Sequence, residues 1–378
     1  MRLDPKRGVG AAAIFRPRSS VPLWRPDRLA RRALARGRTV YPSREAVIAI
    51  LERYGLPRTT RIRPPPSPGG RSTTLVLEGH DGRLLLKRYR ARVELDAIRG
   101  EHSILAELAR CGVAAPRLHP TLDGGTWVEL DGASYAMFEY LEGYIHPHER
   151  FFLPVDRRAL EMVAGDVLAG FHAALDGFEP AANNENGFAG RSGVRVRNRA
   201  WFMERLETAT ARGTGNGAVA GLVDSASWIR DALCRLDDRL EAAEPTRTVI
   251  HGDYGPYNLL VRAGEPVVVI DLELSRVDWQ LTDIATAIPR FAQRRLGFDA
   301  AAASRFLAGY RRRRELPRGE LTLLPDVLAF LSLRRAIVCG ALYRETPADR
   351  WRAEATIRVR LARSILEGQH PIVDLRNA

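Results

Sequence analysis

His251-Gly-Asp-Tyr-Gly-Pro-Tyr-Asn258 stands directly before two apolar, β-rich runs, and the second run ends in Ile270-Asp271. The runs flank Ala263-Gly-Glu-Pro266, a composition typical of a tight connection between antiparallel strands. We therefore predict a β-hairpin centred between Gly264 and Glu265, in which Asn258 pairs with Asp271. Directly opposed residues of an antiparallel pair have Cα atoms roughly 4.5 to 5.5 Å apart, so the two polar side chains should lie together.

The polar residues of this segment suit phosphoryl transfer. Mg²⁺ takes oxygen ligands and usually keeps only one or two protein carboxylates, with phosphate oxygens and water completing its shell. Asn258 and Asp271 could supply such a site, and Asp253, on the loop before the hairpin, could receive a hydroxyl proton. Base, amide ligand and carboxylate ligand follow in that order in kinases. The alternative is a buried hairpin with chance polar residues at its base, which the number of matching positions disfavours.

His-Gly-Asp-x-x-x-x-Asn followed by Ile-Asp resembles the Brenner-type motif of the aminoglycoside phosphotransferase and choline kinase family. The resemblance covers roughly residues 60 to 345 and is strongest at 249 to 285. It implies an α+β, two-lobed protein-kinase-like fold, with a small antiparallel β-sheet N-lobe and a larger, mainly helical C-lobe. It also implies a small-molecule kinase that uses ATP and Mg²⁺, with Asp253 as catalytic base and Asn258 and Asp271 as metal ligands.

Lysine usage marks one further position. Of the 58 basic residues, 56 are arginines, and only Lys6 and Lys87 are lysines. Lys87 ends the second strand of a hairpin predicted to turn at residues 80–82. A compact ammonium fits between α- and β-phosphates better than a planar guanidinium does, and the position matches the ATP lysine of the family.

The helix predicted over about residues 93–110 carries a possible partner for this lysine. The family places a carboxylate in the middle of the helix, where it pairs with the ATP lysine, and here that residue is Glu101. A surface carboxylate beside Arg99 is the alternative interpretation of Glu101.

Two other segments match nucleotide-contacting parts of the family. Gly70, Ser72 and Thr73 belong to a glycine-rich turn before a strand, where backbone amides and hydroxyls can approach phosphates. The resemblance places Glu139 and Leu141 at the hinge, where their backbone groups would meet the adenine edge. A plain interlobe linker remains open for this second segment.

The C-terminal part of the chain contains two residues that we interpret as structural. His172 lies in a predicted helix and is expected to be a core histidine with its hydrogen bonds satisfied. Asp283 matches the aspartate that supports the catalytic loop in the family, and its residue type also suits the N-cap of the apolar run that follows. Both interpretations of Asp283 remain open.

The predicted domain organisation has three parts. Residues 1–40 form a basic, poorly ordered arm, residues 41–140 the nucleotide-binding N-lobe, and residues 141–378 the helical C-lobe. The C-lobe is expected to carry the catalytic loop 251–258 and the metal-binding hairpin 258–271.

Composition narrows the class of protein. The net charge of +13 is concentrated in the arm, which carries +9, so residues 41–378 carry only +4. Nucleic-acid binding would therefore involve the arm alone, and we favour a solvated tail. The apolar runs fall short of the ~18 residues of a membrane span. Three widely spaced cysteines favour free thiols in a reducing cytoplasm.

The sequence therefore predicts an ATP-dependent phosphotransferase that acts on a hydroxyl of a small molecule. Aminoglycosides, amino alcohols, amino acids such as homoserine, and sugars all fit the motif as acceptors. A polycationic acceptor would need acidic residues, for which Glu149, Asp156 and Asp278 are candidates. The alternative function is a nucleotide-binding but inactive kinase-like protein that uses its basic arm for interaction. The sequence gives no oligomeric state.

Overall fold

The computed structural model divides the chain into two compact units. The first unit contains Met1–Asp156, Pro180–Asn183 and Tyr257–Glu273, and the second contains Arg157–Glu179, Asn184–Pro256 and Leu274–Ala378. The structure describes residues 41–57, 61–63, 73–79, 82–89, 95–147, 156–182, 199–211, 219–243, 245–294 and 297–372. The basic arm therefore lies outside the described residues. In the part that is described, we find no helix long and apolar enough to cross a membrane.

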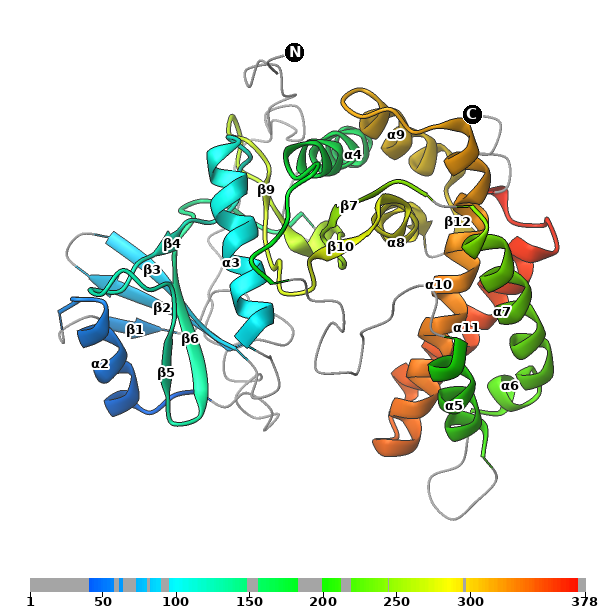
Figure 1. The fold of residues 1–378 in the computed structure, drawn as a ribbon, viewed down its shortest axis with the longest axis horizontal. Coiled ribbons are helices and arrows are strands. Elements are labelled where there is room, and N and C mark those ends of the chain that lie inside the picture. The colour runs from blue at the N-terminus through cyan, green and yellow to red at the C-terminus, as the bar shows by residue number, and fades with distance from the viewer. Residues whose placement is uncertain are drawn as a thin grey trace, which may run out of the picture. The chain divides into compact units, whose positions relative to one another are not determined.

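An antiparallel sheet is the centre of the first unit (Figure 1). Its strand order is β1-β2-β3-β6-β4, and β5 also pairs with β6. Asp131 and Gly132 form the tight turn between β5 and β6, with φ angles of 51° and 69°. The strands are β1 (Arg61–Arg63), β2 (Thr73–Gly79), β3 (Gly82–Arg88), β4 (Leu118–His119), β5 (Val128–Leu130) and β6 (Ala133–Glu139).

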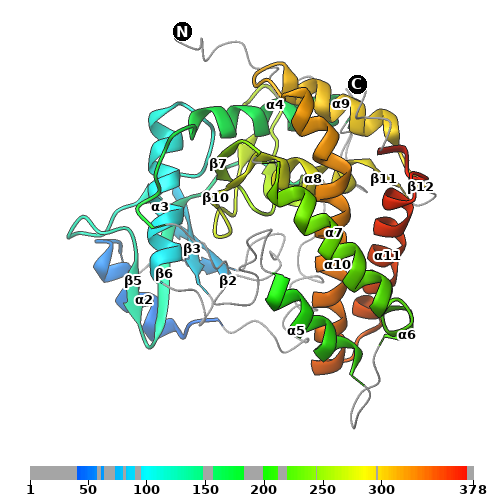
Figure 2. The same ribbon diagram turned by 45° about the vertical axis from the view of Figure 1, so that its right-hand side comes forward.

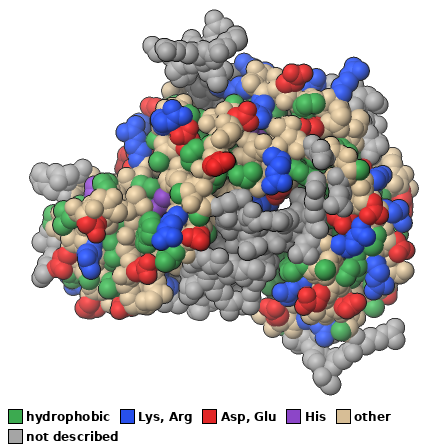
Figure 3. All heavy atoms as spheres, in the orientation of Figure 1, with side chains coloured by type: hydrophobic (Ala, Val, Ile, Leu, Met, Phe, Trp, Pro, Cys, Tyr) green, Lys and Arg blue, Asp and Glu red, His purple; other side chains and the backbone are tan. Residues whose placement is uncertain are grey.

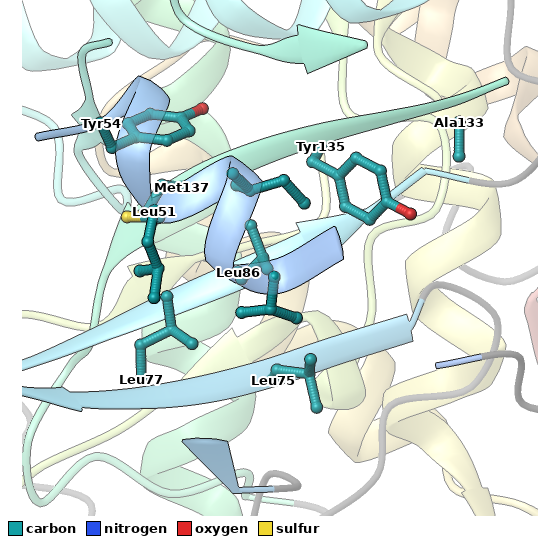
Figure 4. Close-up of a cluster of buried hydrophobic side chains, with 10 residues drawn as sticks. Leu51, Tyr54, Leu75, Leu77, Leu86, Ala133, Tyr135 and Met137 are labelled. Carbon is teal, nitrogen blue, oxygen red and sulfur yellow. The ribbon is translucent and has the colours of Figure 1, made fainter. Parts of the chain in front are cut away.

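One face of this sheet is covered by α2 (Arg44–Arg53) (Figure 4). The helix begins at the cap residue Ser43, whose hydroxyl accepts the backbone N–H of Ala46 at 3.1 Å. Alternate residues of each strand face the helix, because side chains of a strand point to opposite faces in turn. The buried cluster comprises Val47, Ile50, Leu51, Tyr54, Leu75, Leu77, Leu86, Ala133, Tyr135 and Met137.

The same alternation directs Lys87 away from α2. Leu86 belongs to the cluster under α2, so its neighbour Lys87 points to the opposite face. There it meets Glu101 of α3 (Leu95–Arg110), the helix that ends before Gly112 at a φ of 72°. The alternation along β3 and the position of α3 together bring Lys87 and Glu101, two candidate nucleotide-binding residues, to the same side of the sheet.

The hairpin of β8 (Leu259–Leu260) and β9 (Val268–Val269) also belongs to the first unit. The sequence predicts this hairpin in the C-lobe, whereas the structure groups Tyr257–Glu273 with the sheet. Val269 donates its backbone N–H to the carbonyl of Ala114 at 3.1 Å, and Val261 exchanges backbone hydrogen bonds of 2.9 and 3.0 Å with Ile145. These bonds attach the hairpin to the segments that follow α3 and β6.

The second unit is mainly helical, so the predicted α+β class is confirmed. Its longest helix, α10, packs against α5, α7, α8 and α11, while α4 packs against α9 (Figure 2). The helices are α4 (Arg157–Ala174), α5 (Arg199–Thr210), α6 (Ala220–Val223), α7 (Ala226–Glu241), α8 (Gln280–Ala292), α9 (Ala300–Arg311), α10 (Arg318–Glu345) and α11 (Asp349–Leu366). Short strands β11 (Gln293–Arg294) and β12 (Gly297–Phe298) form a hairpin after α8.

A two-stranded ladder in the second unit positions the start of the predicted catalytic loop. Strand β7 (Arg247–Ile250) pairs with β10 (Arg276–Trp279), and Ile250 lies opposite Arg276. Since β10 runs directly into α8, the first turn of α8 reaches the start of the loop after β7. A turn of 3-10 helix, Pro256–Asn258, ends that loop.

Charged side chains of both signs are interspersed on the face shown in Figure 3. This agrees with the small net charge of +4 on residues 41–378. On that face, the described basic residues are not gathered into a single patch.

Candidate active site

The hairpin predicted to bind metal is present, with a register that differs by one residue from the prediction. Leu259 lies opposite Val269, and the carbonyl of Asn258 accepts the N–H of Ile270 at 3.1 Å. Asn258 therefore faces Ile270, and Asp271 lies one residue beyond the ladder. The predicted pairing of Asn258 with Asp271 is wrong, because Asp271 follows the residue that Asn258 faces.

Asp271 has an unusual backbone conformation. Its φ of 64° lies in the left-handed region, which among the described residues other than glycine only Asp131 shares. Such a conformation costs on the order of 1 kcal/mol or more and persists where the surroundings require it. Here it turns the carboxylate toward Lys87, whose ammonium lies 3.6 Å away.

Lys87 is surrounded by three carboxylates. Its Nζ lies 2.9 Å from Glu101 Oε1, 3.6 Å from Asp271 Oδ1 and 3.6 Å from Glu273 Oε2. The side chains of Lys87 and Glu101 are only 8% and 3% exposed, whereas that of Asp271 is 42% exposed. Glu101 is thus a buried partner of Lys87, and the alternative of a surface carboxylate beside Arg99 is wrong.

Burial and charge act in opposite directions on this lysine. Burial alone would lower the pKa of Lys87, but the charges of Glu101, Glu273 and Asp271 together raise it above its ordinary value. The ammonium also lies 4.7 Å from the centre of the Tyr89 ring. The group is therefore a fixed cation at a site with an excess of negative charge.

Some backbone groups of the predicted hinge residues Glu139 and Leu141 already form hydrogen bonds within the protein. The N–H of Glu139 donates to the carbonyl of Arg117 at 2.9 Å, so it is already used. The N–H of Arg117 donates to the Glu139 side chain rather than to its carbonyl. The carbonyl of Leu141 accepts the N–H of Tyr144 at 3.3 Å, which forms a turn after the hinge. The adenine contact of Glu139 and Leu141 remains a prediction.

The predicted glycine-rich turn lies mostly outside the described residues. Gly70 and Ser72 are not among them, and Thr73 is the first residue of β2, opposite Arg88 in β3. Their contact with phosphates remains a prediction.

In the second unit, Asp283 holds the backbone of the catalytic loop. Its carboxylate accepts the N–H of His251 at 2.6 Å and that of Gly252 at 2.8 Å. It also contacts His172 Nε2 at 3.1 Å, and Nδ1 of that histidine contacts the Tyr310 hydroxyl at 2.8 Å. The supporting role of Asp283 is confirmed. Because α8 begins at Gln280, Asp283 lies inside the first turn and is not an N-cap.

Charges in this network are fixed by burial and hydrogen bonding. Burial would raise the pKa of Asp283, but its hydrogen bonds from His172 and the loop hold the pKa below its ordinary value. Burial lowers the pKa of His172, and the contact with Asp283 offsets this only in part. His172 is fully buried with both ring nitrogens occupied, as the sequence predicted.

Gly252 is required by the shape of the loop. Its φ is 80°, and a Cβ atom at this position would lie 2.4 Å from the carbonyl oxygen of Leu274. Only glycine avoids both the left-handed strain and this close approach.

Arg290 is a site residue that the sequence analysis missed. From the last turn of α8 it donates to Asp253 Oδ1 at 2.5 Å and to the carbonyl of Tyr254 at 2.9 Å. Asp283 and Arg290 are seven residues apart, which places them on the same face of a helix. That spacing was a usable signal, because Asp283 was already expected to face the loop.

The fold and these groups define a small-molecule kinase of protein-kinase-like architecture. Residues 61–319 match the model of the phosphotransferase enzyme family, and the chain belongs to this family. A homoserine kinase of Caulobacter vibrioides is 28% identical over 282 residues, which cover 74% of this chain and 81% of that protein. One from Chelativorans sp. is 27% identical over 270 residues, which cover 70% and 76%.

A solved structure supports the same fold. A microcompartment-associated aminopropanol kinase superposes with a TM-score of 0.64 at 20% identity, covering 86% of this chain and 98% of that one. The predicted reaction class, ATP-dependent transfer of phosphate to a small-molecule hydroxyl, is thereby confirmed.

Proposed function

We propose that the protein transfers the γ-phosphate of Mg·ATP to the hydroxyl of a small amino-acid acceptor, with homoserine as the first candidate. The observation that carries the proposal is the Lys87–Glu101 ion pair of 2.9 Å beside Asp271. These are the lysine, helix carboxylate and metal carboxylate that kinases require together. The similarity to homoserine kinases supports the choice of acceptor.

The nucleotide and metal would be held by the first unit. Lys87, positioned by Glu101, would neutralise charge on the α- and β-phosphates, while the Glu139 carbonyl and Leu141 would meet the adenine. Asn258 and Asp271 fit Mg²⁺, because both offer hard oxygen ligands at the end of the hairpin and Asp271 is partly exposed. Bound there, Mg²⁺ would neutralise the charge that develops on the β- and γ-phosphates.

The acceptor would be activated by the second unit. Arg290 holds one oxygen of the Asp253 carboxylate, which fixes the orientation of the side chain. As the acceptor oxygen bonds to the γ-phosphorus and the bond to ADP breaks, the hydroxyl proton passes to Asp253. Asp253 precedes Asn258 by five residues, so the chain leads from the base directly into the metal hairpin.

The charge of the second unit favours a small acceptor over a polycation. Asp278, one of the acidic candidates, is already paired with Arg276, whose guanidinium lies 2.7 and 3.0 Å from the carboxylate. Glu149 lies outside the described residues. Arg290 adds a positive charge at the base itself.

The proposal is tested by ADP release with L-homoserine as acceptor, in Asp253→Asn and Asp299→Asn variants. Asp299 is a matched control, since its side chain is 30% exposed against 31% for Asp253 and it also pairs with arginine. We expect Asp253→Asn to lower kcat by at least about 10²-fold while ATP affinity stays within a few fold. Asp299→Asn should retain activity. Near wild-type turnover by Asp253→Asn would refute the role of the base.

We also propose that the enzyme works in the cytoplasm. ATP is available there, and the three cysteines are far apart in the sequence and are thiols rather than disulfides. We further propose that the basic residues 1–40 do not bind nucleic acid. A salt-dependent gel shift of the full chain against residues 41–378 tests this, and arm-dependent retention of nucleic acid would contradict it.

A further inference from the structure

Two arginines share one carboxylate where α10 packs against α11. Arg335 of α10 donates to both carboxylate oxygens of Glu354 in α11, at 2.9 and 3.0 Å. Arg358, one turn further along α11, reaches the same carboxylate at 3.7 Å. Within the described ranges, Glu354 is the only carboxylate at ion-pair distance from Arg358. The group therefore carries one positive charge in excess.

That excess charge is partly buried. The side chains of Arg335 and Arg358 are 34% and 29% exposed. Burial lowers the pKa of Arg358, Glu354 offsets this effect, and the charges of Arg335 and Arg290 lower the pKa again. A guanidinium removed from water favours a second anionic partner. An anion that binds here would complete the charge balance.

The cluster is connected to the helix that holds the proposed base through α10, which carries Arg335. α10 packs against both α11 and α8, the helix that holds Asp253 through Arg290 (Figures 1 and 2). The charge of Asp253 contributes to the raised pKa of Arg335, as Arg290 contributes to the lowered pKa of Arg358. The base and the arginine cluster thus interact electrostatically within one unit.

The chemistry of the cluster suits a carboxylate. A guanidinium presents donors in a planar fork that matches two carboxylate oxygens. The guanidinium of Arg335 also lies 5.8 Å from the centre of the Trp351 ring, which limits its freedom on one side. We propose that Arg358, together with Arg335, binds the carboxylate of the acceptor while the acceptor hydroxyl faces Asp253. This inference rests on the proposed function and names the residues that select its substrate class.

The test compares two acceptors that differ only in the carboxylate, L-homoserine and 3-aminopropan-1-ol, in the full chain with Mg·ATP. The wild type should prefer homoserine in kcat/KM. Arg358→Met should lower kcat/KM for homoserine by at least about tenfold, mostly through KM, because a hydrogen bond to a charged group is lost. The value for 3-aminopropan-1-ol should stay within about threefold, because that acceptor never makes the bond.

Two further variants separate binding from folding. Arg352→Met is the matched control, because it is the same substitution on the same helix at a side chain that is 58% exposed. It should leave kcat/KM for both acceptors unchanged. Arg358→Lys keeps the charge without the fork, so its loss for homoserine should be smaller than that of Arg358→Met. This variant also provides the test if Arg358→Met does not fold.

The outcomes distinguish this inference from the function on which it rests. Suppose that the wild type phosphorylates homoserine but that Arg358→Met and Arg358→Lys lower kcat/KM equally for both acceptors, or for neither. The carboxylate site is then wrong and the kinase assignment stands. If the wild type uses neither acceptor, the proposed acceptor class is wrong and the inference fails with it.

Discussion

Replacing Lys87 by methionine would leave three carboxylates without their shared cation. Methionine has a similar length, so the cavity would be small and the loss mainly electrostatic. The side chains of Lys87, Glu101 and Glu273 are 8%, 3% and 5% exposed, so water cannot compensate fully. Removing one partner of a buried ion pair costs about 3–5 kcal/mol. We expect the first unit to lose stability by that amount near neutral pH.

The assay is hydrogen exchange of peptides from β3 and α3, since it reports the opening free energy of this unit alone. Arg83→Met is the matched control on the same strand. Its 43% exposed side chain pairs with Glu142 at 3.1 Å, and such a pair is worth about 0–1 kcal/mol.

A double variant, Lys87→Met with Glu101→Gln, should recover about 1–3 kcal/mol relative to the sum of the single changes. A loss below about 1 kcal/mol in Lys87→Met, or strict additivity in the double variant, would refute the electrostatic account.

Three further predictions concern single positions. Asp271→Ala should abolish turnover and Mg²⁺-dependent ATP binding; unchanged Mg·ATP affinity by calorimetry would exclude the metal role. Gly252→Ala should lower the free energy of unfolding of the second unit by about 2 kcal/mol or more and slow turnover, because the new Cβ would lie 2.4 Å from the Leu274 carbonyl oxygen. An unchanged melting temperature would contradict this. Burial lowers the pKa of His102 from 6.5 to about 3. As the pH falls, the unfolded state therefore binds a proton before the folded state does, and the free energy of unfolding decreases. The loss is about 2 kcal/mol between pH 7.5 and 5; His102→Gln should flatten this dependence in urea titrations.

The sequence predicted the hairpin of β2 and β3 and the helix α3 because local signals and packing agree in this unit. The spacing of Val47, Ile50, Leu51 and Tyr54 gives α2 one apolar face, and alternate residues of the strands supply the other side of the core. The same alternation separates Leu86 from Lys87, so the ion pair with Glu101 could be anticipated once α3 was placed. The family resemblance supplied the identity of that partner.

The hairpin register could not be predicted to the residue. Its loop runs from Val261 to Val267, an odd number of residues centred on Gly264, whose φ is 80°. Both valines read as strand residues in the sequence, yet Val261 pairs with Ile145 instead of with the facing strand. Apolar character shows that a residue is buried but not which segment covers it, and a shift of one residue is the consequence.

The catalytic loop shows where a motif fails and helical geometry succeeds. The motif identifies Asp253 and supports Asp283, but it does not include Arg290. The contact between Arg290 and Asp253 arises only when α8 folds. Once Asp283 faces the loop, a helix of 3.6 residues per turn brings residue 290 to the same face two turns later. Asp283 then fixes the backbone before the base, and Arg290 fixes its carboxylate and the Tyr254 carbonyl after it. One helix therefore holds the loop on both sides of the proposed base, and shortening α8 by one residue between these two positions should disorder the base without removing it.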